Sequence, residues 1–158
     1  MPDTPARALP LSSVASNQAE VFAAARESTL KRIKVMVVDD NPQFASAAAQ
    51  FLAGNGGFEV LANAHSGGEA LVRVDDEQPD LMFIDISMPG LNGLAVASLI
   101  KAKKDPPKIV MMTLEDGDGY RRGALAAGAD AFLAKNDFAR DLRDVVQTVF
   151  GPCVARTS

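Results

Sequence analysis

The stretch VMVVDDNPQF, residues 35–44, joins a short apolar run to two adjacent carboxylates and then to the start of a helix. The run is continuous in apolar residues, which is typical of a parallel strand covered by helices on both faces. Asn41 is a favourable N-cap, and Pro42 fits the first helical position, where its missing N–H costs nothing. The stretch therefore predicts a buried strand that ends on Asp39 and Asp40, followed directly by a helix.

The same alternation of strand and helix continues along the chain. The other apolar runs are also bounded by Gly, Pro or polar residues, and they are too short to be buried helices. The predicted strands are 33–38, 58–62, 81–84, 108–113 and 131–134, and the predicted helices are 42–53, 66–76, 93–103, 118–127 and 137–150. Five consecutive βα units predict an α/β fold, (βα)5, with a doubly wound parallel sheet.

The length of 158 residues fits one domain, which we place at residues 33–150. Three prolines among Ser, Thr and Ala predict a flexible N-terminal tail at residues 1–16. Residues 17–32 are rich in helix formers and form a candidate extra helix, which either packs on its own domain or contacts a partner. Residues 151–158 are predicted to be a C-terminal tail.

Composition excludes several classes of function. The formal net charge of −4 argues against non-specific binding to nucleic acid or to anionic membranes. The single cysteine, Cys153, rules out an internal disulfide and a cysteine-rich zinc site. No apolar run approaches the ~18 residues needed to span a bilayer. We therefore expect a cytoplasmic protein that does not contact membranes or nucleic acid directly.

Polar residues stand at the ends of four predicted strands. Asp39 and Asp40 follow the first strand, Asp85 follows the third, Thr113 ends the fourth and Lys135 follows the fifth. In an open parallel sheet, ligands bind outside the carboxyl ends of the strands. Each residue alone has an ordinary interpretation as a turn, cap or surface residue, but five together at successive strand ends favour a common site.

The residue types in this set suit metal-assisted phosphoryl transfer. Carboxylates clustered at the edge of an apolar core need a cation, and a site with oxygen ligands only favours Mg²⁺ or Mn²⁺. A carboxylate can act as nucleophile to form an acyl phosphate, while a metal, a lysine and a hydroxyl stabilise the transferring oxygens. We assign Asp85 as the nucleophile, because it stands alone in the middle of the sheet, and Asp39 with Asp40 as the metal-holding pair.

Four motifs resemble the receiver domains of two-component response regulators, above all those of helix-turn-helix regulators. The resemblance covers about residues 33–150. The motifs are VVDDN (37–41), DISMPGLNG (85–93), MMTLEDG (111–117) and GADAFLAK (128–135).

The resemblance implies a flavodoxin-like fold with strand order 2-1-3-4-5, and phosphorylation of Asp85 by a histidine kinase or a histidine phosphotransfer protein. It also implies Mg²⁺ bound by Asp40, Asp85 and the backbone carbonyl of Ser87, with a contribution from Asp39. The only chemistry that it implies is phosphorylation and dephosphorylation of the protein itself.

The resemblance further implies a switch. Thr113 and Phe132 match the switch pair, and Lys135 matches the lysine that pairs with the phosphoryl oxygens. Phosphorylation would then remodel the surface formed by residues 118–127, 131–134 and 137–150. The implied partners are a downstream protein or an effector domain absent from this chain, with a homodimer as a further candidate.

The sequence departs from the family at two positions. Asn136 follows the lysine, where receivers commonly carry a proline after a cis peptide bond. Leu114 follows the switch hydroxyl, where the family usually has a small residue, and we expect it to narrow access to Asp85. These departures leave a second hypothesis open: the chain keeps the receiver fold but acts as a protein-interaction module that does not depend on phosphorylation. An enzyme acting on a small phosphate ester would need a substrate cap, which the sequence does not supply.

Overall fold

A computed structural model describes residues 32–114 and 118–151. The chain divides into two units at Arg32 and Ile33, and the elements described below all belong to the second unit. The predicted tail at 1–16, the candidate helix at 17–32 and the tail at 151–158 fall outside the described residues, apart from Arg32 and Gly151. Those three assignments therefore stay predictions.

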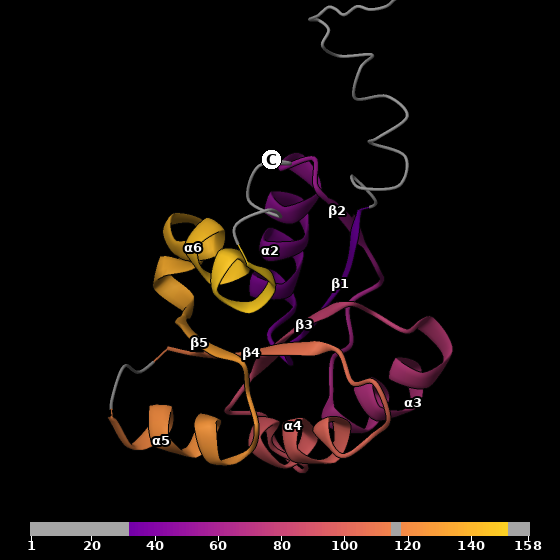
Figure 1. The fold of residues 1–158 in the computed structure, drawn as a ribbon, viewed down its shortest axis with the longest axis vertical. Coiled ribbons are helices and arrows are strands. Elements are labelled where there is room, and N and C mark those ends of the chain that lie inside the picture. Colours follow the sequence, from indigo (N-terminus) through magenta and orange to yellow (C-terminus); the bar gives the residue numbers. More distant parts are fainter. Residues whose placement is uncertain (1–31, 115–117, 152–158) are drawn as a thin grey trace, which may run out of the picture. The chain divides into compact units, whose positions relative to one another are not determined.

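The described residues form one five-stranded parallel sheet with helices on both faces (Figure 1). The sheet order is β2-β1-β3-β4-β5, which confirms the predicted (βα)5 flavodoxin-like fold. The strands are β1 (Ile33–Val38), β2 (Phe58–Val60), β3 (Leu81–Asp85), β4 (Lys108–Thr113) and β5 (Ala131–Ala134). The helices are α2 (Pro42–Gly54), α3 (Gly67–Glu77), α4 (Gly93–Lys101), α5 (Asp118–Ala126), α6 (Phe138–Phe150) and the 3-10 turn η1 (Lys135–Asp137).

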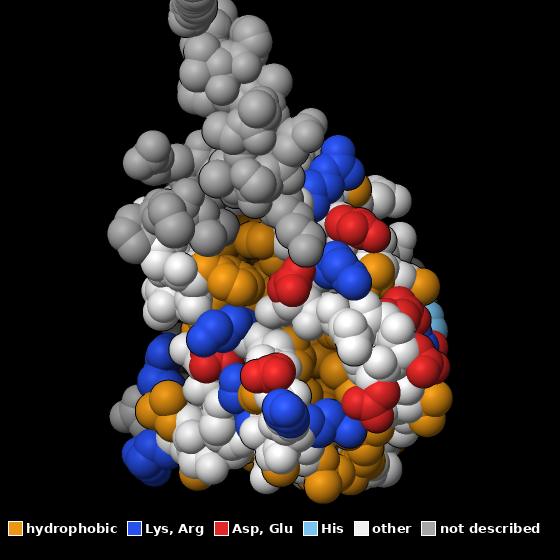
Figure 2. All heavy atoms as spheres, turned by 45° about the vertical axis from the view of Figure 1, so that its right-hand side comes forward, with side chains coloured by type: hydrophobic (Ala, Val, Ile, Leu, Met, Phe, Trp, Pro, Cys, Tyr) orange, Lys and Arg blue, Asp and Glu red, His pale blue; other side chains and the backbone are white. Residues whose placement is uncertain are grey.

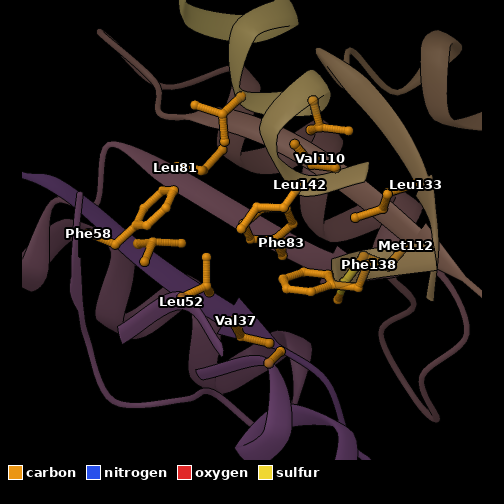
Figure 3. Packing of buried hydrophobic residues seen from close by; sticks show 14 of the residues in the cluster. Val37, Leu52, Phe58, Leu81, Phe83, Val110, Met112, Leu133, Phe138 and Leu142 are labelled. Atoms are coloured by element: carbon orange, nitrogen blue, oxygen red, sulfur yellow. The ribbon is translucent and has the colours of Figure 1, made fainter. Parts of the chain in front are cut away.

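The side chains of each central strand point alternately to the two faces of the sheet, and each face has its own hydrophobic core. Val35 and Val37 of β1 pack with α2 and α6, whereas Met36 and Val38 pack with the helices on the other face. In Figure 1, α2 and α6 lie on one side of the sheet, and α3, α4 and α5 lie on the other. Figure 3 shows the first core, in which Phe83 of β3 and Phe138 of α6 point toward each other. Burial on both faces explains why the strands are continuously apolar.

In three of the described helices, the side chain of the N-cap residue accepts a hydrogen bond from the backbone of the first turn. Asn41 Oδ1 accepts hydrogen bonds from the backbone N–H groups of Gln43 and Phe44 at 3.0 and 3.2 Å, as the sequence predicted. Ser66 Oγ caps α3 and Asn92 Oδ1 caps α4 in the same way. These caps fix where each helix starts relative to the strand before it.

Some element boundaries differ from the prediction. β2 ends at Val60, not at residue 62, although the chain stays beside β1: Leu61 N–H donates to Val35 O, and Ala64 N–H donates to Val37 O. α4 ends at Lys101, not at residue 103, because the chain closes in a tight turn before the Asp-Pro-Pro segment, which cannot continue a helix. η1 precedes α6, so α6 begins one residue later than predicted.

Two observations concern the surface. No helix within the described ranges is long and apolar enough to cross a membrane. Figure 2 shows one face of the molecule, on which acidic and basic side chains are interspersed with hydrophobic ones. The charged side chains on that face are therefore not all of one sign.

Candidate functional site

Polar residues are buried at one edge of the sheet. Among the described residues, the buried polar or charged side chains are Asp39, Asp85, Thr113 and Lys135, with exposed fractions of 0%, 4%, 2% and 7%. They come from the carboxyl ends of β1, β3, β4 and β5. The structure therefore gathers four of the five predicted strand-end residues into the interior of this edge, and the fifth, Asp40, is exposed beside them.

Three carboxylates converge at this edge. Asp39, Asp40 and Asp85 each offer an oxygen within 4.8 Å of the others. Asp39 Oδ1 accepts a hydrogen bond from Asn41 N–H at 2.8 Å, but its buried Oδ2 receives no aligned hydrogen bond. A buried carboxylate oxygen without a hydrogen bond is costly unless a cation compensates it, and here the Lys135 ammonium lies 2.6 Å from this oxygen. The three convergent carboxylates, all oxygen donors, fit a hard divalent cation such as Mg²⁺ or Mn²⁺.

Lys135 supplies the positive charge of the site. Its Nζ lies 2.6 Å from Asp39 Oδ2 and 3.4 Å from Asp85 Oδ2, and its side chain is 5% exposed. The contact with Asp39 is an ion pair without the alignment of a hydrogen bond. Lys135 opens the turn η1, and the Lys135–Asn136 peptide bond is trans. The lysine thus reaches both buried carboxylates without a proline after it.

The carboxyl group of Asp85 has a raised pKa. Burial is the largest cause and the charge of Asp39 is the second, and together they raise the pKa to about 6. Lys135 and the Ser87 N–H, which donates to Asp85 Oδ1 at 3.1 Å, act in the opposite direction. Near neutral pH, Asp85 is therefore a desolvated carboxylate that retains more basicity than an exposed aspartate.

Thr113 and Phe132 lie on neighbouring strands. Thr113 ends β4 and stands opposite Ala134 in β5, whereas Phe132 stands opposite Met111, two positions further back. Phe132 is half-buried, and the Arg121 guanidinium of α5 lies 4.7 Å from the centre of its ring. Leu114, directly after Thr113, is 64% exposed. Thr113 is therefore buried at the edge of the sheet with the other polar residues, whereas the Phe132 ring lies near the surface beside α5.

Two further residues lie at the site, and the sequence assigned a role to neither of them, although Gly93 belongs to the motif at 85–93. The ring of Phe44, in the first turn of α2, lies 4.7 Å from Lys135 Nζ. Gly93 begins α4 so close to β3 that a Cβ there would lie 2.0 Å from the backbone oxygen of Asp85. An apolar residue at a helix start is typical of core packing, and a glycine there is typical of a turn. Neither residue type indicates a site on its own.

Comparison with protein families gives one result for most of the chain. Residues 35–147 match the family model described as the response regulator receiver domain. The response regulator protein VraR of Staphylococcus aureus is 32% identical over 117 residues, which cover 73% of this chain and 55% of VraR. The chain therefore spans about half the length of the curated relatives it matches.

Solved structures give the same result. The signal receiver domain of NarL from Mycobacterium tuberculosis matches with a TM-score of 0.67 and 26% identity, over 74% of this chain and 98% of that one. A DNA-binding response regulator of the LuxR family from Staphylococcus aureus matches with a TM-score of 0.69 and 26% identity, with the same shares covered.

Proposed function

Because the chain belongs to the response regulator receiver domains of two-component signalling systems, we propose that it accepts a phosphoryl group on Asp85. One observation carries the proposal: Asp85 is buried at the end of the central strand β3, between a second carboxylate and a lysine. A buried structural aspartate would be expected to have its charge satisfied locally. Asp85 instead retains a raised pKa, because burial and Asp39 outweigh Lys135.

The transfer is a substitution at phosphorus. A carboxylate oxygen of Asp85 forms a bond to the phosphorus while the bond from phosphorus to the donor atom breaks, and the donor atom keeps that electron pair. The Lys135 ammonium, already 3.4 Å from Asp85 Oδ2, is placed to pair with a phosphoryl oxygen. We assign the Thr113 hydroxyl to a second phosphoryl oxygen. Phosphorylation and dephosphorylation of Asp85 are then the only reactions of the domain.

Asp39, Asp40, Asp85 and the backbone carbonyl of Ser87 are proposed to hold a divalent cation, Mg²⁺ or Mn²⁺. Such an ion neutralises negative charge on the transferring phosphoryl oxygens. Support comes from the three convergent carboxylates, whose oxygens lie within 4.8 Å of one another. Burial is the main cause of the raised pKa of Asp85 and repulsion by Asp39 is the second cause, and a cation held at this edge would reduce that repulsion.

The proposed output is a change in the surface of α5, β5 and α6. When the Thr113 hydroxyl turns toward the phosphoryl group, it leaves room behind it, into which the ring of Phe132 rotates. Phe132 starts from a position beside Arg121 of α5, so its rotation would alter this surface. The switch thus couples a new charge at the buried edge to an exposed helix.

The proposed partners follow from the family. The phosphoryl donor is a histidine kinase or a histidine phosphotransfer protein, and the receiver of the signal is a downstream protein, an effector domain or a second copy of this chain. One structural relative is a DNA-binding regulator of the LuxR family. For the receiver residues themselves we propose no direct contact with nucleic acid or membrane, and a cytoplasmic location.

Intact-mass spectrometry tests the proposal. The protein is incubated with acetyl phosphate, with Mg²⁺ or with EDTA, alongside Asp85→Asn and Asp76→Asn, an exposed aspartate of α3. We expect a mass increase of one phosphoryl group in the wild type and in Asp76→Asn with Mg²⁺. We expect none in Asp85→Asn and little in EDTA. An unmodified wild type would instead favour the phosphorylation-independent interaction module.

A further inference from the structure

The buried ammonium of Lys135 touches an aromatic ring as well as two carboxylates. Its Nζ lies 4.7 Å from the centre of the Phe44 ring, within the ~6 Å over which a cation and a ring face attract each other. The lysine side chain is 5% exposed. Because little water screens the pair, the attraction is stronger than at an exposed site.

The ring is itself held by other aromatic side chains. Phe44 meets Phe138 edge to face, with ring centres 5.9 Å apart and planes at 88°. Phe138, the first residue of α6, packs in turn against Phe83, 5.0 Å away. Phe83 lies in β3 two residues before Asp85. Phe44 is therefore fixed relative to the strand that carries the proposed phosphorylation site.

The ring differs from the other contacts of the lysine. Under the proposed function, on which this inference rests, Asp39 holds a cation and Asp85 carries the phosphoryl group, so both carboxylates acquire new partners. We expect the ring to keep its contact, because its packing against Phe138 depends on neither carboxylate. A ring face attracts the ammonium without taking up an aligned N–H bond. We propose that Phe44 is a positioning residue, which holds the Lys135 ammonium at the site through its ring face and leaves its N–H groups for the phosphoryl oxygens.

Two leucine variants separate this role from core packing. Phe44→Leu removes the ring face but keeps an apolar side chain. Phe51→Leu is the matched control, because Phe51 lies on the same helix and also meets Phe138 edge to face, with ring centres 6.2 Å apart. We expect Phe44→Leu to slow phosphorylation by acetyl phosphate roughly three- to tenfold. Phe51→Leu and Phe44→Tyr, which retains a ring, are expected to stay near the wild-type rate.

A series of fluorinated residues isolates the electrostatic part. Mono-, di- and trifluorinated phenylalanine at position 44 progressively remove negative charge from the ring face while almost preserving its shape. We expect the logarithm of the phosphorylation rate to fall steadily along the series. This measurement remains informative if Phe44→Leu folds poorly, because the fluorinated rings keep the packing.

A spectroscopic measurement needs neither metal nor phosphoryl donor. In the metal-free protein, the methylene protons next to the Lys135 ammonium should show an upfield ring-current shift. That shift should vanish in Phe44→Leu and persist in Phe51→Leu.

The proposal is overturned if the ring-current shift is absent from the wild type, if the fluorinated series has a flat rate, or if Phe51→Leu slows the reaction as much as Phe44→Leu. Failure of the proposed function looks different, because the wild type itself would then acquire no phosphoryl group on Asp85.

Discussion

Asp85 carries a charge that the folded protein disfavours. Its pKa rises from 3.8 to about 6 on folding, chiefly through burial and then through Asp39. An acid with a raised pKa binds its proton more tightly when folded, so its contribution to stability is complete below the unfolded pKa and is lost as the pH rises through the folded one. A difference of about two pKa units corresponds to a cost of at most about 3 kcal/mol at neutral pH.

We therefore predict that Asp85→Asn stabilises the metal-free protein, and more so at higher pH. In EDTA, its free energy of unfolding should exceed that of the wild type, and the excess should grow by about 1 kcal/mol between about pH 5 and about pH 7.5. Urea unfolding at the two pH values measures this excess, with Asp76→Asn as the control that shows no such growth. An excess that shrinks with rising pH would mean that Lys135 outweighs the burial of Asp85.

Individual residues of the site were predictable to different degrees. Asp39, Asp85, Thr113 and Lys135 could be assigned to one edge from the sequence, because parallel strands bring their carboxyl ends together. The contact of Phe44 with Lys135 could not, since it depends on how a helix side chain and a loop side chain pack across the sheet edge. The roles assigned to Ser87 and Phe132 still come from the family resemblance.

At the scale of elements, α4 packs directly against the end of β3. The N–H of Gly93, the first residue of α4, donates to Ile86 O at 3.0 Å. A Cβ at Gly93 would lie 2.0 Å from Asp85 O and 2.9 Å from Ile86 Cα, both of which are backbone atoms that cannot move aside as a side chain can. The glycine therefore allows the helix to approach the segment that carries the proposed phosphorylation site.

We predict that Gly93→Ala lowers the free energy of unfolding by about 2 kcal/mol or more, because the helix must shift away from β3. Gly68→Ala in α3 is the matched control: a Cβ there meets nothing within 4 Å, and alanine favours a helix by up to ~1 kcal/mol. Chemical denaturation measures both variants. Equal stabilities of Gly93→Ala and the wild type would contradict the close approach of α4 to β3.

The elements themselves were largely predictable, because apolar runs between Gly and Pro residues mark strands and because Asn41 marks a helix start. The residues at which the elements begin and end were harder to predict. β2 is short because Leu61 and Ala64 continue beside β1 in an irregular path, which depends on the neighbouring strand. The turn η1 likewise depends on how the chain passes from β5 into α6.

At the scale of the whole molecule, the strand order brings the residues of the proposed site together. Periodicity predicts five parallel strands but not their order, which only the family resemblance supplied. In the structure, β1 pairs with β3 and β4 pairs with β5, with Val38 opposite Ile84 and Thr113 opposite Ala134. That register brings Asp39 next to Asp85, and Thr113 close to the loop that begins with Lys135. A different order would have scattered the same residues along the edge.

The central claim is that Asp85, among 20 acidic residues, is the one that becomes an acyl phosphate. Borohydride reduces an acyl phosphate to an alcohol, so it converts a phosphorylated aspartate into homoserine and leaves free carboxylates unchanged. The measurement is peptide mapping by mass spectrometry after treatment of the protein with acetyl phosphate and Mg²⁺, followed by borohydride. We predict homoserine at position 85 and at no other acidic position. Homoserine elsewhere, or none at all, would contradict the account.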